Sequence, residues 1–214
     1  MVSGKIKVKF DWFTIVLYFA LVGIGWINIY SASLSDSPGG LFDFSQIYAR
    51  QLIFIILSLL LIIFILAVDS KFYERFSSVI YIISLVSLLG LFVFGNSING
   101  ATSWYSFGSF GIQPSEFAKA ATALALSKYV SDIQTNVQEF KHQVRSFIII
   151  ALPALFIIPQ PDPGSALIYA AFIFPLYREG LHFVYLLFGF VLATLFVSTL
   201  IFGVIWVAIG ILLI

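Results

Sequence analysis

The chain has 214 residues, of which 61% are hydrophobic and only 10% are charged, and its mean hydropathy is +1.06. Because a soluble domain averages roughly 45–50% apolar and about 25% charged residues, a soluble globular enzyme and a disordered chain are both excluded. The 11 basic residues are balanced by 10 acidic ones, so there is no basic field for a nucleic acid. With no cysteine and two histidines, no metal site is predicted. The composition predicts an all-α polytopic membrane protein.

Apolar runs follow one another along the chain, separated by short breaks that hold most of the charges. A helix needs about 20 mostly apolar residues to cross a bilayer. The first run is longer than the roughly 7–15 apolar residues of a signal peptide, so we expect an uncleaved helix. The last run reaches Ile214 without a polar flank, from which we expect the chain to be part of a longer protein. The runs are residues 12–31, 51–68, 77–94, 114–130, 147–158, 165–177 and 183–214.

The basic residues alternate from break to break, as a threaded chain requires. They lie in the N-terminal tail and at residues 71–75, 128–145 and 178, whereas the intervening breaks are nearly free of them. The positive-inside rule therefore puts these segments, and with them the N-terminus, in the cytoplasm. The sequence predicts a single membrane domain over residues 1–214 with about seven spans.

The cytoplasmic linker at residues 131–145 allows two interpretations. Val137, Phe140 and Val144 recur at helical spacing beside Lys141, which is typical of a helix lying at the inner membrane interface. An ordinary solvated loop explains the same residues equally well.

The outward-facing loop at residues 96–113 is rich in glycine, serine, asparagine and aromatic residues. We expect a re-entrant or interfacial hairpin that places its aromatic rings at headgroup depth. Trp104 is then either part of an interfacial aromatic belt or a side chain that faces a substrate.

Gln113-Pro114-Ser115-Glu116 predicts a helix start, with proline at the first helical position and an acidic residue in the first turn. Lys119 is harder to explain by structure alone, because a cation near this end opposes the helix dipole. Since Glu116 and Lys119 are three residues apart, they share a helix face and can pair. Ionisable residues inside a span are costly and mark functional sites, so the pair is either functional or a structural ion pair.

A second constellation is Pro159-Gln160-Pro161-Asp162-Pro163-Gly164-Ser165, whose three alternating prolines exclude a continuous helix. The flanking runs are about 12–13 residues each, near 18–20 Å, so each is too short to cross a bilayer alone. Asp162 before a proline suits a helix N-cap. The break also suits a cavity lining, where the N–H groups of residues 164–166 meet an anionic ligand. Both interpretations stay open.

The motifs are Asn99-Gly-Ala-x-x-Trp104, Gln113-Pro-Ser-Glu-Phe-x-Lys119, and Pro153 followed by Gln160-Pro-Asp-x-Gly-Ser-Ala. In order and spacing they resemble the SEDS proteins (shape, elongation, division and sporulation), the family of RodA and FtsW. The short N-terminal tail makes the resemblance closer to RodA. It covers the chain from the first span to about residue 180.

The resemblance implies a ten-span peptidoglycan glycosyltransferase of the bacterial cytoplasmic membrane that polymerises lipid II, an undecaprenyl-diphosphate-linked disaccharide peptide, for cell elongation and shape. It also implies a class B penicillin-binding protein as partner. The family's catalytic aspartate is expected in an outer loop after Ile214, so no catalytic residue is assigned here and this chain is predicted to be incomplete. The residues expected to bind substrate or support activity are Trp104, Gln113, Glu116, Lys119, Gln160, Asp162 and Ser165.

In such a reaction a sugar hydroxyl displaces a lipid diphosphate, which cationic or N–H groups must stabilise. We hypothesise that Lys119 and the helix start after Asp162 hold the diphosphate, and that Glu116 orients Lys119. A divalent cation bound to the diphosphate is compatible with this, although the chain shows no cage for one. The alternatives are a flippase or other transporter of lipid-linked oligosaccharides, since broken helices with buried charge also serve transport, and a non-catalytic scaffold for the penicillin-binding protein.

Overall fold

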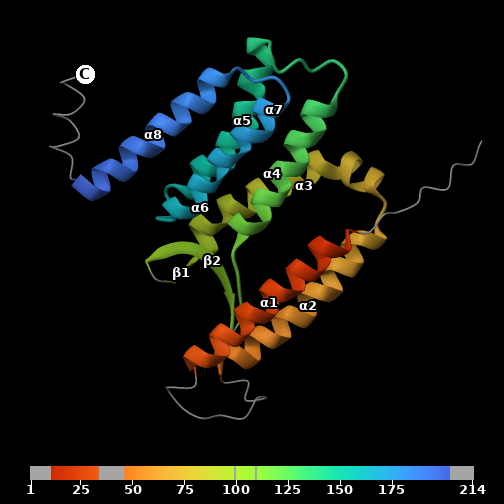
Figure 1. The fold of residues 1–214 in the computed structure, drawn as a ribbon, viewed down its shortest axis with the longest axis vertical. Helices are drawn as coiled ribbons and strands as arrows, with labels where there is room; N and C mark the ends of the chain where they lie inside the picture. Colours follow the sequence, from red (N-terminus) through yellow and green to blue (C-terminus); the bar gives the residue numbers. More distant parts are fainter. Residues whose placement is uncertain (1–10, 34–45, 99, 109, 203–214) are drawn as a thin grey trace, which may run out of the picture. The chain divides into compact units, whose positions relative to one another are not determined.

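The computed structural model describes residues 11–33, 46–98, 100–108 and 110–202, and the chain divides into two compact units at Asp69 (Figure 1). Residues 1–69 form one unit and residues 70–214 the other. The basic N-terminal tail, Asn99 and most of the loop after the first span lie outside the described residues.

The first unit is a pair of helices, α1 (Trp12–Ser33) and α2 (Ile47–Ala67). Trp26 Nε1 donates a hydrogen bond of 3.1 Å to the carbonyl oxygen of Tyr48, and the Tyr30 ring stacks on Trp26 and meets Tyr48 edge-on. Most other side chains of these helices are exposed and apolar, as expected of surfaces that face lipid. Asp11 caps α1, and its hydrogen bonds from Thr14 hold the pKa of its carboxyl below the ordinary value.

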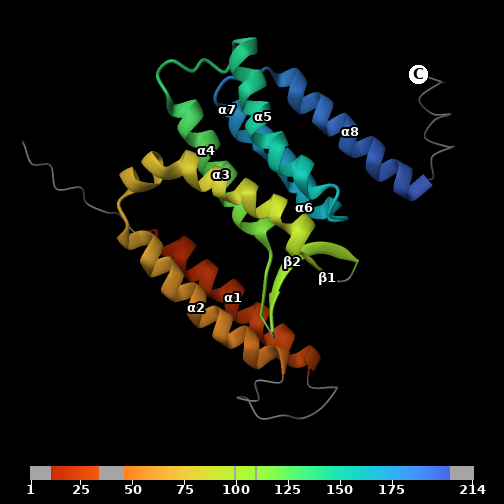
Figure 2. The same cartoon turned by 180° about the vertical axis from the view of Figure 1, so that it is seen from behind.

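The second unit holds the remaining helices and a small sheet (Figure 2). Its core is made by residues that are almost fully buried, among them Leu88, Leu91, Ala118, Ile157 and Tyr169. Helix α4 packs against both α3 and α5, and the short elements α6 and η1 also pack against α5. The helices are α3 (Ser70–Phe94), α4 (Pro114–Ser131), α5 (Phe140–Ile157), α6 (Pro163–Ile168), the 3-10 helix η1 (Tyr169–Phe172), α7 (Ile173–Arg178) and α8 (Phe183–Phe202).

The predicted hairpin between α3 and α4 is an antiparallel sheet of three short strands. They are β1 (Asn96–Ile98), β2 (Ala101–Phe107) and β3 (Phe110–Ile112), in the order β1-β2-β3. Trp104 pairs with Asn96 on one side, and Tyr105 pairs with Ile112 on the other. Successive residues of β2 face opposite sides of the sheet, so Trp104 and Tyr105 point in opposite directions.

Two sequence predictions are wrong around α5. The apolar run before the proline-rich break was expected to be too short to span, but α5 is 18 residues long because the mostly polar residues 140–146 belong to the helix. Within that stretch Gln143 and Ser146 are buried. The 131–145 linker is therefore shorter than predicted, and Val137 lies buried outside any helix. Neither of the two interpretations of this stretch holds throughout, because Phe140 and Val144 lie in α5 whereas Val137 lies outside any helix.

The largely helical membrane architecture is confirmed. Within the described residues, four helices are long and apolar enough to cross a membrane: α1, α2, α3 and α5. Helix α4 is not among them; it carries Glu116, Lys119 and Lys128. The predicted run at 165–177 lies in the succession α6, η1 and α7, in which a 3-10 helix separates two short α-helices; we call this succession the broken helix.

Candidate functional site

The start of α4 is built as the sequence predicts, with one difference at its N-cap. Pro114 occupies the first turn, where its missing N–H costs nothing, and Glu116 lies in the same turn near the positive end of the helix dipole. The N-cap residue is Gln113, whose backbone is extended and whose side chain does not cap the helix. Its backbone carbonyl accepts a hydrogen bond of 3.2 Å from the N–H of Glu116. The Gln113 amide is thereby left available for another partner.

The predicted ion pair between Glu116 and Lys119 is confirmed. Lys119 Nζ lies 2.7 Å from Glu116 Oε2, and the two side chains differ in burial: Lys119 is 19% exposed and Glu116 is 55% exposed. The Lys119 side chain is thus four-fifths buried and its ammonium is held by the carboxylate of a more exposed side chain. A pair exposed in this way is weak, so it leaves Lys119 able to exchange Glu116 for another anion.

The start of α6 is capped by its own residue. Asp162 is the N-cap and Pro163 follows in the first turn. Asp162 Oδ1 accepts a hydrogen bond of 3.1 Å from the backbone N–H of Ser165, and its backbone carbonyl accepts one of 3.3 Å from Ala166. The prediction that the N–H groups of residues 164–166 are free for an anionic ligand is therefore wrong for Ser165 and Ala166.

The two helix starts are joined by their cap residues. Gln113 Nε2 donates a hydrogen bond of 3.0 Å to Asp162 Oδ2, across 49 residues of sequence. Each oxygen of the Asp162 carboxylate thus holds a donor, one from its own helix and one from α4. The structure brings Gln113, Asp162 and Ser165, three of the predicted site residues, into one network.

Gln160 fixes the loop before Asp162 by contacts with two other elements. Its side chain is 1% exposed, and its Nε2 donates a hydrogen bond of 3.1 Å to the carbonyl oxygen of Leu88 in α3. Its backbone carbonyl accepts one of 3.2 Å from the N–H of Thr102 in β2. Gln160, predicted as a site residue, is therefore a structural anchor of the break.

Tyr105 anchors the sheet to the same turn of α3, which the sequence analysis missed. Its hydroxyl donates a hydrogen bond of 2.7 Å to the carbonyl oxygen of Ser87, next to the Leu88 carbonyl used by Gln160. The phenol reaches the helix over Gly90, where a Cβ would collide with it. Gly90 inside an apolar run is the sequence signal for this close approach.

Trp104 lies on the other face of β2 and is half-buried. Its ring packs over Gly111 of β3, where an added Cβ would lie 3.1 Å from the ring. The described contacts connect Trp104 to the other site residues through the backbone of β2. They leave its two predicted roles, belt or substrate contact, open.

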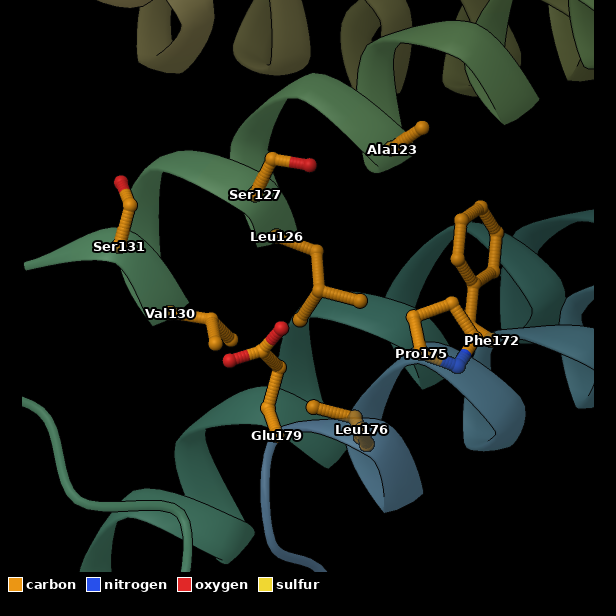
Figure 3. A pocket seen from close by; sticks show the side chains of 9 residues that line it. All are labelled: Ala123, Leu126, Ser127, Val130, Ser131, Phe172, Pro175, Leu176 and Glu179. Atoms are coloured by element: carbon orange, nitrogen blue, oxygen red, sulfur yellow. The ribbon is translucent and has the colours of Figure 1, made fainter.

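Two cavities lie away from this network. One has a volume of about 350 Å³ and lies between the second half of α4 and the η1–α7 segment; Figure 3 shows Leu126 and Val130 facing Phe172, Pro175 and Glu179. The other, about 870 Å³, is lined almost entirely by apolar side chains of α5, the broken helix and α8. None of the seven predicted site residues lines either cavity. Among the described residues, no group of three or more histidines and acidic residues is arranged to hold a metal ion.

Comparison with known proteins gives a consistent result. The family model FTSW_RODA_SPOVE, described as "Cell cycle protein", matches residues 11–211. Peptidoglycan glycosyltransferase RodA of Treponema pallidum is 32% identical over 160 residues, which are 75% of this chain and 36% of that protein.

Solved structures agree with the sequence relatives. The crystal structure of the rod shape determining protein RodA of Thermus thermophilus matches with a TM-score of 0.73 and 28% identity, over 88% of this chain and 60% of that one. A chain of a peptidoglycan synthase complex, studied for its coordination of polymerization and crosslinking, matches with a TM-score of 0.73 and 26% identity over 90% of this chain and 54% of that one. The chain spans between 36% and 45% of the length of the curated relatives it matches.

Proposed function

Because this chain belongs to the FtsW, RodA and SpoVE family of cell cycle proteins, we propose that it forms part of a peptidoglycan glycosyltransferase that polymerises lipid II. The family resemblance predicted from the motifs is thereby confirmed. We place the protein in the bacterial cytoplasmic membrane with its N-terminus in the cytoplasm, on the alternation of its basic residues. A role in cell elongation and shape is the more specific part of the proposal; its support is the match to a solved RodA structure, while curated FtsW and RodA relatives match the chain at similar identities.

The proposed reaction joins two lipid-linked saccharides. A hydroxyl of the acceptor sugar attacks the anomeric carbon of the donor, the bond from that carbon to the diphosphate oxygen breaks, and the lipid diphosphate leaves. The hydroxyl proton passes to a general base, a role that we assign to no residue of this chain. The leaving diphosphate gains negative charge, and a fixed cation near it lowers the barrier.

The observation that supports this function best is the Lys119 ammonium. The Lys119 side chain is largely buried on a helix of a membrane protein, and its ion-pair partner among the described residues is a more exposed carboxylate at 2.7 Å. A diphosphate carries more charge than a carboxylate, so it can displace Glu116 and take the ammonium as its own partner. Glu116 then holds Lys119 in position between turnovers. A divalent cation, if the reaction uses one, would arrive with the diphosphate.

The helix start after Asp162 is left out of this diphosphate site. The N–H groups of Ser165 and Ala166 already bond to Asp162, so they have no donor to spare for a leaving group. We assign Asp162, Gln160 and Gln113 to the support of the site.

We propose that the partner is a class B penicillin-binding protein, which would crosslink the glycan that this protein makes. The support is the match to a chain of a complex that coordinates polymerization with crosslinking. Co-purification of the complete protein with a class B penicillin-binding protein of the same organism tests this assignment. Recovery of the polymerase without any crosslinking enzyme contradicts it.

The test of the function is made with the complete protein that contains this chain, purified and reconstituted in vesicles with lipid II. We expect glycan chains, seen as a ladder on a denaturing gel. Movement of lipid II across the vesicle membrane without polymer identifies a flippase instead. Polymer that forms only when a separate glycosyltransferase is added identifies a scaffold.

A further inference from the structure

We propose that Asp162 and Gln113 are a positioning pair: the Asp162 carboxylate supports the reaction by joining α6 to α4 through Gln113, without touching the substrate or moving a proton. This inference rests on the proposed glycosyltransferase function for its kinetic consequences. Its structural content, a joint between two helix starts, is independent of what the protein catalyses.

The first support is that the carboxylate is already engaged. Oδ1 accepts the N–H of Ser165 at 3.1 Å, and Oδ2 accepts Nε2 of Gln113 at 3.0 Å. A general base presents an oxygen to the proton that it removes, and a ligand for a cation presents an oxygen to the metal. Asp162 presents its oxygens to two protein donors on two helices, which is the arrangement of a connector.

The second support is the contact that the side chain of the α4 N-cap residue makes with another helix. Gln113 does not cap its own helix with its side chain. Its amide instead reaches Asp162, while its backbone carbonyl accepts the N–H of Glu116 at 3.2 Å. Glu116 in turn holds Lys119 at 2.7 Å. A continuous series of contacts therefore runs from the Asp162 carboxylate through Gln113 and Glu116 to the Lys119 ammonium.

The third support is that few other described hydrogen bonds hold the segment before α6 to its neighbours. Gln160 bonds this segment to α3 and to β2. The described hydrogen bond that joins it to the start of α4 is the one from Gln113 to Asp162. Without this bond the start of α6 loses its described hydrogen bond to α4, although the helix still packs on α5. We then expect the side chains of Glu116 and Lys119, on the α4 side of the joint, to be held less precisely.

The structural test is hydrogen exchange by mass spectrometry on the complete protein without substrate. Gln113→Ala changes the N-cap residue of α4, and we expect it to raise exchange in residues 163–168, which lie in α6. Gln134→Ala, an exposed glutamine of the α4–α5 loop, is the matched control and is expected to leave that peptide unchanged. Unchanged exchange at 163–168 in Gln113→Ala overturns the joint, whether or not the protein proves to be a polymerase.

The kinetic test is a double-mutant cycle in the lipid II polymerisation assay. We expect Gln113→Ala and Asp162→Ala each to lower kcat by about 10- to 100-fold, the size of a hydrogen bond to a charged group. The double variant is expected to be no less active than Asp162→Ala alone, because the bond that Gln113→Ala removes is one of the two that Asp162→Ala removes. Losses that multiply overturn the pairing.

Asp162→Asn separates positioning from chemistry. Asparagine is a good N-cap and keeps the bond from Ser165, and its amide can donate to Gln113 once the Gln113 amide turns to present its oxygen. We therefore expect kcat within about threefold of wild type and an unchanged pH–rate profile. An Asp162→Asn protein that is folded but as inactive as Asp162→Ala shows that the charge itself acts, and contradicts the proposal. A wild-type protein that makes no polymer contradicts the proposed function alone, and the exchange experiment then decides the joint.

Discussion

The starts of α4 and α6 use the same elements, a glutamine, prolines and an acidic residue, in different ways. At α6 the acidic residue is the cap, and it satisfies its own helix through Ser165 and Ala166. At α4 the cap position holds Gln113, which bonds to the neighbouring helix, and the acidic residue Glu116 lies in the first turn and pairs with Lys119.

The difference separates two tasks that the sequence patterns left together. A helix start that satisfies its own N–H groups is a rigid support and has nothing to offer an anion. A helix start that carries a partly exposed ion pair keeps a cation that can change partners. We therefore assign the chemistry to α4 and the support to α6, and the experiments below test that division.

The largest effect is expected from Lys119→Ala on α4. Removal of the cation that faces the leaving diphosphate should lower polymerisation by at least about 100-fold, the size seen when one electrostatic donor of a transition state is lost. Lys119→Arg keeps the charge and should recover part of the activity. Lys128→Ala, near the other end of the same helix, is the control. Polymerisation by Lys119→Ala at half the wild-type rate or more would remove α4 from the chemistry.

A smaller effect, on stability, is expected from Gln160→Ala at the entry to α6. The change deletes a buried side chain and its bond to the Leu88 carbonyl, which should cost about 2–3 kcal/mol of unfolding free energy. Thermal unfolding in detergent measures the loss, with Gln134→Ala as the exposed control. An unchanged melting temperature would show that the break needs no anchor on α3.

Tyr105→Phe makes the corresponding change in β2, the strand of the segment that leads from α3 to α4. It keeps the ring that packs over Gly90 and removes only the hydroxyl that bonds to the Ser87 carbonyl. The expected loss is about 1 kcal/mol, the net contribution of one hydrogen bond. Because the Gln160 and Tyr105 bonds end on neighbouring carbonyls, the same unfolding assay compares the two anchors directly. A loss larger than that of Gln160→Ala would reverse the order that burial predicts.

The sequence predicted the elements that rest on local patterns. Pro114 and Glu116 at the start of α4, Asp162 and Pro163 at the start of α6, and the i,i+3 ion pair all follow from spacing, and the structure confirms them. The start of α5 was missed because Lys141 and Arg145 are typical of a loop by composition, whereas the buried Gln143 and Ser146 on the same turns keep the segment helical.

The contacts between segments were beyond sequence reasoning for a physical reason. The bonds from Tyr105 and Gln160 end on backbone carbonyls, which every residue carries, so nothing at Ser87 or Leu88 marks them as acceptors. The bond from Gln113 to Asp162 joins the N-cap residues of two helices that lie 49 residues apart in the sequence. The motif predicts that Asp162 caps its own helix, but nothing in either motif indicates that its second oxygen meets Gln113, because the packing of the segments decides that contact.

The smallest effect is expected from Ser165→Ala, and it bears on the comparison most directly. The donor to Asp162 is the backbone N–H of Ser165, which alanine keeps, and alanine is favoured within a helix. Polymerisation should therefore stay within about twofold of wild type, since the hydrogen bond from the backbone N–H of residue 165 to Asp162 is kept. If the rate instead falls tenfold in a protein of unchanged melting temperature, the Ser165 hydroxyl itself contacts the substrate. The start of α6 would then share the chemistry with α4, and support and chemistry would no longer be separable between the two helices.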